Sequence, residues 1–207
     1  MKNQFYYFFA ILSIVFTVSC SEKSIKVENN SIQLNRFDEF EIENHFKSTM
    51  SKQVFDSLHS WEFASAIIDP VLVMIQSTPF ELQRVKRLAA GQKALYFFLK
   101  TDQQVDHGGF VQFYWNGFEG YIPPLREGLS LIKDRKMLKL IEEVDTYYQK
   151  NKQKFEKAED VEAFNALYDD CPAFKKMTEN YKELREVSVK KLEQYVKNHP
   201  DEFVVFE

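Results

Sequence analysis

The chain has 207 residues, carries a formal net charge of −4 at pH 7 and is 15% aromatic. That length suits one domain or at most two small ones, and the aromatic content is typical of a packed core and excludes a wholly disordered chain. Mild acidity without a dominant basic stripe argues against direct binding of nucleic acid.

Residues 1–19 have the pattern of an export signal. Lys2 gives a weak positive start, and an apolar run over residues 5–18 precedes the small residue Ser19. A membrane-spanning helix needs about 20 apolar residues, whereas the core of a signal peptide has roughly 7–15. The ending Thr17-Val18-Ser19-Cys20 resembles the lipobox of bacterial lipoproteins, with Thr17 where Leu is usual.

The lipobox resemblance implies that Cys20 is acylated and becomes the first residue of the mature protein. The protein would then be anchored by lipid to a membrane of the bacterial cell envelope, on its extracytoplasmic side. The alternative is an uncleaved N-terminal anchor, which places the bulk of the chain on the same side. Residues 20–35 are polar without a sustained period, so we expect them to be a flexible tether, followed by a domain over residues 36–207.

From Phe37 onward the apolar spacing predicts helices almost throughout. The expected helices of the first half cover 37–48, 51–68, a segment that begins at Pro70 and runs toward Gln76, and a segment from 80 to 105 that Gly91 interrupts.

The second half contains the clearest helix, which follows Asp134. Apolar residues at positions 137, 141, 144 and 148 share one face, and Asp134 is well placed as the N-cap. A second long helix is expected over 174–197, and only residues 203–206 have the character of a strand. The sequence therefore predicts an all-α fold, a single domain of roughly seven to eight helices behind the tether.

One block, from Val105 to Gly117, differs from an ordinary amphipathic helix. Two adjacent glycines permit positive φ or close backbone approach, so we expect one helix to end and the next to begin there. Several large apolar side chains follow, and two amides four residues apart share a face and can bond each other or nearby backbone groups. The residues of this motif are Gly108, Gly109, Phe110, Gln112, Phe113 and Asn116.

This glycine-aromatic block, with the helix after Asp134 and the stretch from Tyr181 to Phe203, resembles the bacterial DNA-mimic-protein family. The resemblance covers about residues 60–203, is strongest over 105–118, and departs from the family pattern at His107, where Asn is usual. It implies an all-α fold and, for the member that named the family, an acidic dimer that imitates duplex phosphates and occupies the DNA site of a regulator. The motif residues are expected to build the central junction of the fold.

Acidic residues gather in one part of the second half, as an acidic partner surface requires. The cluster consists of Glu156, Glu159, Asp160, Glu162, Asp169 and Asp170. Lysines and arginine mixed with glutamates follow it over residues 175–191, which favours an ordinary solvated helix surface over DNA mimicry. Lysines at 150, 152 and 154 before the cluster predict an exposed connection between helices.

Signals for catalysis are weak. The four histidines lie apart in the sequence without the spacing of a helical zinc site, so neither a metal nor a cofactor is expected. Asp106 beside His107 is the nearest thing to a catalytic pair, but helix capping or surface hydration explains both residues more simply. Cys171 between acids and Pro172 is expected to be an inert thiol.

The leading hypothesis is a non-catalytic, lipid-anchored domain that binds an unidentified protein partner and no nucleic acid directly. One alternative is a DNA mimic whose acidic surface occupies the DNA site of a nucleic-acid-binding protein. A second is an immunity or inhibitor protein against an exported toxin. Whether the chain forms a homodimer is left open by the sequence.

Overall fold

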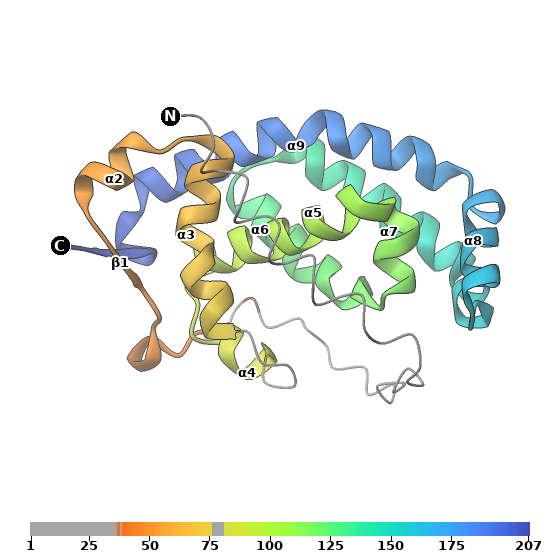
Figure 1. Ribbon diagram of the computed structural model, residues 1–207, viewed down its shortest axis with the longest axis horizontal. Coiled ribbons are helices and arrows are strands. Elements are labelled where there is room, and N and C mark those ends of the chain that lie inside the picture. Colours follow the sequence, from red (N-terminus) through yellow and green to blue (C-terminus); the bar gives the residue numbers. More distant parts are fainter. Residues whose placement is uncertain (1–36, 38, 76–80) are drawn as a thin grey trace, which may run out of the picture. The chain divides into compact units, whose positions relative to one another are not determined.

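The computed structural model describes residues 37, 39–75 and 81–207. The expected signal, Cys20 and the tether over 20–35 lie outside the described residues. Within them the fold is all-α, as predicted, with eight α-helices and one small sheet (Figure 1). The α-helices are α2 (Lys52–Ser57), α3 (Ser60–Ile75), α4 (Glu81–Val85), α5 (Ala90–Trp115), α6 (Ile122–Leu131), α7 (Arg135–Lys157), α8 (Val161–Asp170) and α9 (Ala173–Asn198). The shorter elements are the 3-10 helices η1 (Ile42–Asn44), η2 (Phe118–Tyr121) and η3 (Pro200–Glu202), and the strands β1 (Ser48–Met50) and β2 (Val204–Phe206).

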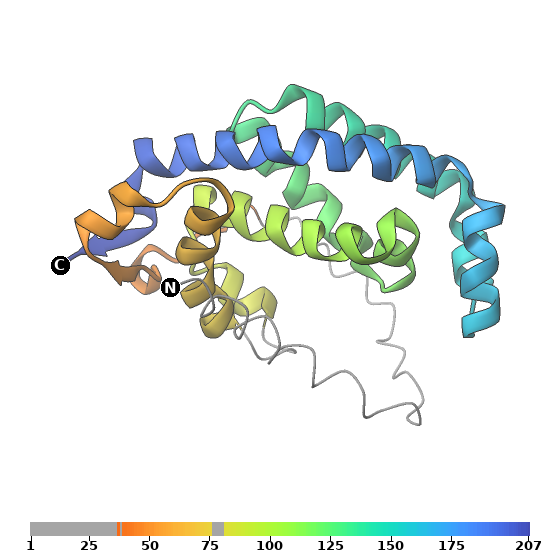
Figure 2. The same cartoon turned by 45° about the horizontal axis from the view of Figure 1, so that its top comes forward.

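The core lies among five helices, α3, α5, α6, α7 and α9, with α5 at its centre. α5 packs against α6 and α9, and α7 packs against the same two helices, while α3 contacts both α5 and α9. Figure 2 shows α9 running along the bundle and α8 standing across its far end. The first half of α5 is buried almost all round because it has neighbours on several sides.

The sequence pattern of α7 and α9 is confirmed. The Asp134 side chain accepts a hydrogen bond from the Met137 N–H and caps α7, although at 3.5 Å the contact is long. All four of the apolar residues expected inside, at 137, 141, 144 and 148, are buried. α9 begins and ends within one residue of the predicted 174–197.

The predicted helix over 37–48 is wrong. That segment contains only the single turn η1 and then the strand β1. Its backbone is satisfied from elsewhere, because the N–H of Glu41 donates to the Lys86 carbonyl and the N–H of Phe46 donates to the Arg87 carbonyl. Hydrogen bonds to a distant loop replace the bonds within a helix that the apolar spacing suggested.

The predicted helix over 51–68 is two helices, and Pro70 does not begin a new one. The chain breaks at Leu58 and His59, and Ser60 then adopts φ 50° with its N–H bonded to Glu193 of α9. Pro70 lies inside α3, where it removes one hydrogen bond from the helix. The apolar face of α3 nevertheless continues through it, from Phe63 to Ile75, and this burial keeps the helix whole.

The predicted segment over 80–105 is interrupted before Gly91. α4 ends at Val85, and Gly91 lies in the first turn of α5. A Cβ on Gly91 would lie 2.4 Å from the Tyr195 ring and 2.7 Å from the Phe203 ring. The glycine therefore permits close packing of α5 against the C-terminal elements and does not end a helix.

The two strands come from opposite ends of the described chain and pair in parallel, Ser48 opposite Val204 and Met50 opposite Phe206. Only β2 was expected. The sequence does not predict β1, because its three residues, Ser48 to Met50, have no alternating apolar pattern.

The exposed connection predicted from lysines 150, 152 and 154 and the acids at 159, 160 and 162 is shorter than expected, since the three lysines lie in α7, which runs to Lys157. Only residues 158–160 separate α7 from α8. Among the residues that the structure describes, no helix combines the length and the apolar character needed to cross a membrane.

Candidate functional site

The motif glycines divide α5. Gly108 and Gly109 have non-helical dihedral angles, with φ 68° and ψ −168° at Gly109, so one helical segment ends and another begins there as predicted. A Cβ on Gly109 would lie 2.7 Å from Thr178 Oγ1 of α9. Thr178 Oγ1 also accepts a hydrogen bond from the Phe110 N–H at 3.2 Å. The break therefore brings the α5 backbone against α9.

The motif aromatics lie in the core. Phe110 and Phe113 are buried and pack edge to face, and the Phe110 ring also contacts Phe174 and Tyr181 of α9. Phe113 packs in addition on Phe118, which follows α5. These two side chains are placed to hold helices together and not to contact a partner.

The two motif amides have different surroundings. Asn116 is exposed at the end of α5, where its backbone N–H donates to the Gln112 carbonyl. Its side chain donates to Gln104 Oε1 at 2.9 Å and not to the Gln112 side chain. A Cβ on Gly108 would meet the Gln112 side chain at 2.2 Å.

The six predicted acidic residues lie together at the end of the bundle, on the last turn of α7, the connection and α8. All six are exposed. We call residues 156–170 the acidic segment, because it holds these six carboxylates and a single lysine, Lys157. Asp160 also caps α8, accepting a hydrogen bond from the Ala163 N–H at 2.8 Å.

Two of the acids sit at the unfavourable end of their helix. Asp169 and Asp170 end α8, where the partial negative charge of the helix dipole disfavours carboxylates by roughly 0.3–1 kcal/mol each at the surface. None of the ion pairs found among the described residues involves Glu156, Glu162, Asp169 or Asp170. Asp169 and Asp170 are therefore placed at some cost to α8, whereas Glu162 lies in its first turn, where the dipole favours a carboxylate. All four carboxylates are exposed.

α8 is joined to the rest of the bundle on its inner side. The Tyr168 hydroxyl donates to the Gly108 carbonyl at 3.0 Å, and the Phe164 ring packs on Trp115 with ring centroids 4.4 Å apart. Leu167 is buried. The glycine break of α5 and the acidic segment are thus in direct contact.

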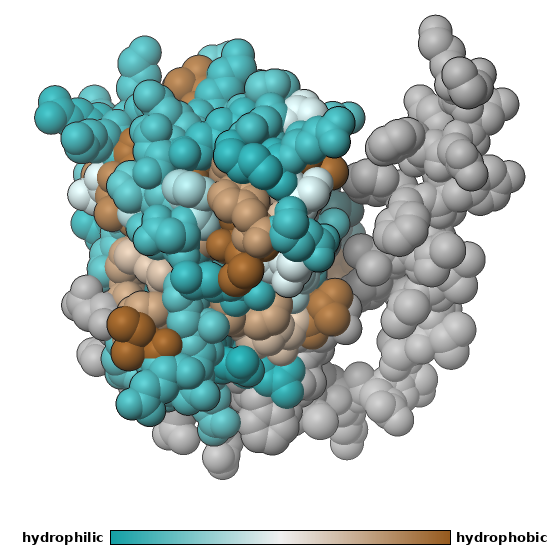
Figure 3. Space-filling view, turned by 90° about the vertical axis from the view of Figure 1, so that its left-hand side faces the viewer, coloured by the Kyte–Doolittle hydropathy of each residue, from teal (hydrophilic) through white to brown (hydrophobic). Residues whose placement is uncertain are grey.

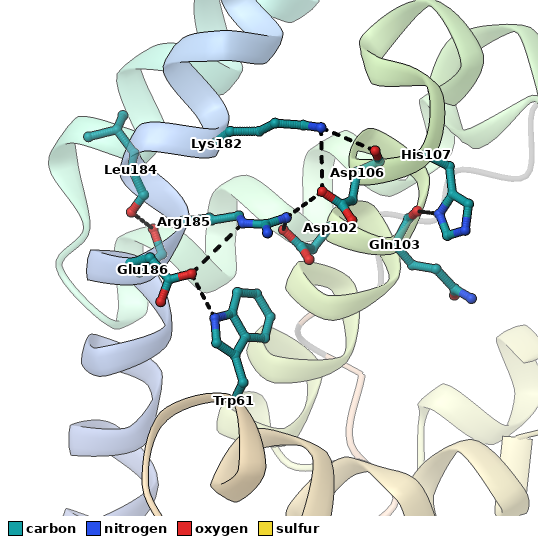
Figure 4. A network of polar contacts seen from close by, with 10 residues as sticks. Trp61, Asp102, Gln103, Asp106, His107, Lys182, Leu184, Arg185 and Glu186 are labelled. Carbon is teal, nitrogen blue, oxygen red and sulfur yellow. Dashed lines mark hydrogen bonds and ion pairs between the residues drawn. The ribbon is translucent and has the colours of Figure 1, made fainter. Parts of the chain in front are cut away.

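A network of polar contacts joins α5, α9 and α3 (Figure 4). Arg185 Nη1 lies 2.7 Å from Asp106 Oδ1 and 3.6 Å from Asp102 Oδ1, and its guanidinium lies 5.5 Å from the centre of the Trp61 ring. Lys182 Nζ lies 3.4 Å from Asp106 Oδ1. No sequence pattern predicts this network as a whole. The spacing of four residues places Asp102 and Asp106 on one face of a helix, but the sequence does not indicate which helix packs against that face.

Burial raises the pKa of Asp102 to about 6, against the opposing effect of the Arg185 charge. Burial also raises the pKa of the neighbouring Tyr181 well above its ordinary value. The Tyr181 hydroxyl interacts with the Asp102 carboxyl and lowers its pKa, in opposition to burial. Thr101 Oγ1, next to Asp102 in the sequence, is buried without a hydrogen-bond partner among the described residues.

Asp106 and His107 do not form a pair with each other. Asp106 faces the two cations of α9, whereas His107 Nδ1 lies 2.6 Å from the Gln103 carbonyl of its own helix (Figure 4). The arrangement in which an acid orients the imidazole for proton transfer is absent here. Two depressions of about 280 and 440 Å³ adjoin each other between α7 and α9, and neither is lined by His107.

The remaining candidates for chemistry are isolated. Cys171 is buried, and burial raises the pKa of its thiol. Across residues 39–75 and 81–207, no group of three or more histidine, cysteine, aspartate and glutamate side chains is arranged to hold a metal ion.

Comparison with known proteins gives one match. The family model described as DMP19-like protein matches residues 86–199, inside the stretch over which the motif resemblance was drawn. Searches of curated proteins and of solved structures gave no match. The matched residues contain both the glycine break and the acidic segment.

Proposed function

The chain belongs to the DMP19-like protein family, the DNA-mimic family that its glycine-aromatic block resembles, and on this premise we propose that it binds a basic partner protein. The proposed binding surface is the acidic segment, residues 156–170. The partner class is a protein with a nucleic-acid-binding surface, which the carboxylates occupy in place of phosphates. The protein performs no reaction of its own in this proposal.

The observation that carries the proposal is the concentration of charge. Residues 156–170 hold six acids and one lysine, although the whole chain has a net charge of only −4. A surface with this density of carboxylates attracts a basic surface over about one Debye length, ~8–10 Å at physiological salt. The mixed charges on α9, by contrast, neutralise one another through pairs such as Lys176 with Glu179.

One exposed edge of α8 supports a protein partner in particular. Val161 is exposed, and seven residues later the Tyr168 ring is 42% exposed while its hydroxyl donates to the Gly108 carbonyl. Glu162 and Asp169 repeat the same spacing beside them. Residues seven apart lie on one face of a helix, so an apolar stripe runs beside an acidic one. Such a pairing suits a basic protein surface that also offers an apolar contact.

We place this binding in the cell envelope, because the N-terminal pattern ending in Cys20 is that of a lipoprotein signal. The partner would then be a basic, nucleic-acid-binding protein that works outside the cytoplasm. Labelling cells with a fatty-acid analogue tests the anchor: the wild type should be labelled and the Cys20→Ser variant should not. An unlabelled wild type found in the cytosol with residues 1–19 attached would overturn the placement.

The binding surface is tested by removing charge from the acidic segment. A variant with Glu156→Gln, Glu162→Gln, Asp169→Asn and Asp170→Asn should lose at least tenfold in affinity for a partner captured from the membrane fraction, and its binding should depend less on salt. The matched control carries Glu142→Gln, Glu143→Gln, Glu179→Gln and Glu183→Gln on α7 and α9, and should bind as the wild type does.

Competition with nucleic acid separates mimicry from ordinary acidic binding. A duplex oligonucleotide at saturating concentration should displace the protein from its partner, because both occupy one surface. Simultaneous binding of the duplex and the protein would contradict mimicry. Equal loss of affinity in the two quadruple variants would show that net charge, and not the acidic segment, determines binding.

A further inference from the structure

The small sheet at the other end of the molecule has an open edge. β1 and β2 form a two-stranded parallel sheet, with Ser48 opposite Val204. The Ser48 N–H donates to the Phe203 carbonyl, and the Glu207 N–H donates to the Met50 carbonyl. In a parallel ladder, the backbone N–H and C=O groups of successive residues point alternately toward the neighbouring strand and away from it. Residues 203, 205 and 207 therefore face β1, and the backbone groups of Val204 and Phe206 point to the opposite edge.

That edge has no backbone partner in the part of the chain that the structure describes. Natural proteins protect an edge strand by keeping it very short, or with a charged side chain, a proline or a covering element, because unpaired N–H and C=O groups invite another strand. β2 is short, with three residues. β2 contains neither a proline nor a charge between Phe203 and Phe206. Its side chains favour pairing instead of preventing it.

The surface around β2 is apolar. Val205 is 53% exposed, and Phe206 and Val54 of α2 are exposed as well. Phe206 packs edge to face on Phe55 of α2, so the two elements form a continuous surface. Figure 3 looks onto the side of the molecule where α2 and β1 lie, and apolar side chains interrupt its hydrophilic surface.

The exposed charges at the two ends of β2 are acidic. Asp201 lies in η3 before the apolar run from Phe203 to Phe206, and Glu207 follows that run. Lys52, whose ammonium lies 5.6 Å from the Phe206 ring, is paired with Asp56. A second copy paired in antiparallel fashion would bring Glu207 of each chain toward Asp201 of the other, so like charges oppose self-pairing. A segment with basic residues at both ends would place opposite charges there instead.

We propose that β2 accepts a third strand, an extended segment of another protein that has an apolar centre and a basic residue at each end. Its backbone pairs with the outward N–H and C=O groups of Val204 and Phe206. The added strand runs antiparallel to β2, so its central residue lies opposite Val205 as a non-hydrogen-bonded pair, where side chains approach most closely. The site is separate from the acidic segment and does not depend on the function proposed for that segment.

The test uses an acetylated and amidated heptapeptide, Lys-Thr-Val-Thr-Val-Thr-Lys, and the full chain. Amide hydrogen exchange measured by NMR should slow at least tenfold at Val204 and Phe206 when the peptide is present, and should change little at Val205. The same peptide with glutamate at both ends should bind at least tenfold more weakly. A peptide N-methylated at alternate residues, which cannot donate those hydrogen bonds, should not bind.

Variants of the protein complete the test. Phe206→Pro removes an N–H that points away from β1, together with the ring that packs on Phe55, so Phe206→Leu, which keeps the N–H, is its control. Both variants should retain the fold, and the peptide affinity should fall at least tenfold further in Phe206→Pro than in Phe206→Leu. Val205→Lys should also weaken binding, whereas Val187→Lys on α9, where the valine is 49% exposed, should not. Equal affinity in Phe206→Pro and Phe206→Leu, or unchanged affinity for the N-methylated peptide, would overturn the proposal. So would dimers of the wild type in which Val204 and Phe206 are protected without any peptide.

Discussion

Asp102 is a buried carboxyl held between two helices, and its ionised form is disfavoured. Its Oδ1 atom lies 3.6 Å from Arg185, too far for a hydrogen bond, while Arg185 is 2.7 Å from the competing Asp106. The negative charges of Asp106 and Glu186 add to the effect of burial on the Asp102 pKa. Asp102 therefore carries a penalty at neutral pH that its neighbours do not fully offset.

The folded-state pKa of about 6 lies above the unfolded value of 3.8, so the penalty acts above pH 6 and disappears as the pH falls toward 4. Asp102→Asn should raise the free energy of unfolding at pH 7.5 by up to about 3 kcal/mol, since each pKa unit corresponds to about 1.4 kcal/mol. At pH 4 the variant and the wild type should have nearly equal stability. Urea unfolding of both proteins between pH 4 and 8 measures the difference.

Comparing the two proteins at each pH cancels the contributions of other groups. The pKa of Glu193, for example, is shifted in the opposite direction. Burial would raise it, but hydrogen bonds from Lys197, Ser60 and His59 lower it to about 2. Its stabilisation is therefore lost as the pH falls below 4.5, in both proteins alike. A stability difference that stays constant from pH 4 to 8 would show that Asp102 is not the group responsible.

At the scale of elements, the glycine break decides how α5 meets its neighbours. The backbone at Gly109, φ 68° and ψ −168°, lies in a region that only glycine occupies readily. At the break, the Phe110 N–H donates to Thr178 of α9 and the Gly108 carbonyl accepts a hydrogen bond from Tyr168 of α8. A straight α5 would not make these two contacts. The backbone conformation at the glycines therefore fixes how α8 and α9 meet α5.

Gly109→Val should lower the free energy of unfolding by roughly 3 kcal/mol or more, because it adds backbone strain and a Cβ that would lie 2.7 Å from Thr178 Oγ1. Gly117→Ala is the matched control, since Gly117 also has positive φ, at 80°, but its Cβ would have open space. The control should cost about 1 kcal/mol, the strain alone. Urea unfolding measures both, and equal losses would contradict a role for the contact with Thr178.

At the scale of the whole molecule, the family match is shorter than the structural unit. The matched stretch, residues 86–199, omits α3, yet Phe63, Ile67 and Val71 of α3 are buried in the same core as α5 and α9. It also omits Phe203, whose ring would touch any Cβ placed on Gly91. The matched helices are therefore completed by elements on both sides of the match.

A fragment of residues 86–199 should not fold cooperatively alone, because removing α3 and the C-terminal elements exposes the apolar face that they cover. A fragment of residues 37–207 should unfold in one cooperative step. Thermal unfolding followed by near-UV circular dichroism distinguishes the two fragments. A sharp transition in the shorter fragment would show that α3 is an addition to a core already complete without it.

The sequence by itself determined the class of the fold, the glycine break of α5, and α7 and α9 with their buried faces, because these depend on local spacing, a capping aspartate and the freedom of glycine. It also located the acidic segment, since charge density is a property of composition. The tertiary structure alone decided the path of residues 37–50, the continuity of α3 through Pro70, and the pairing of Arg185 with Asp102 and Asp106. In each of these, a hydrogen bond, an ion pair or burial against a distant segment outweighs the local preference. The pattern within one stretch of sequence does not indicate which distant segment will pack against it.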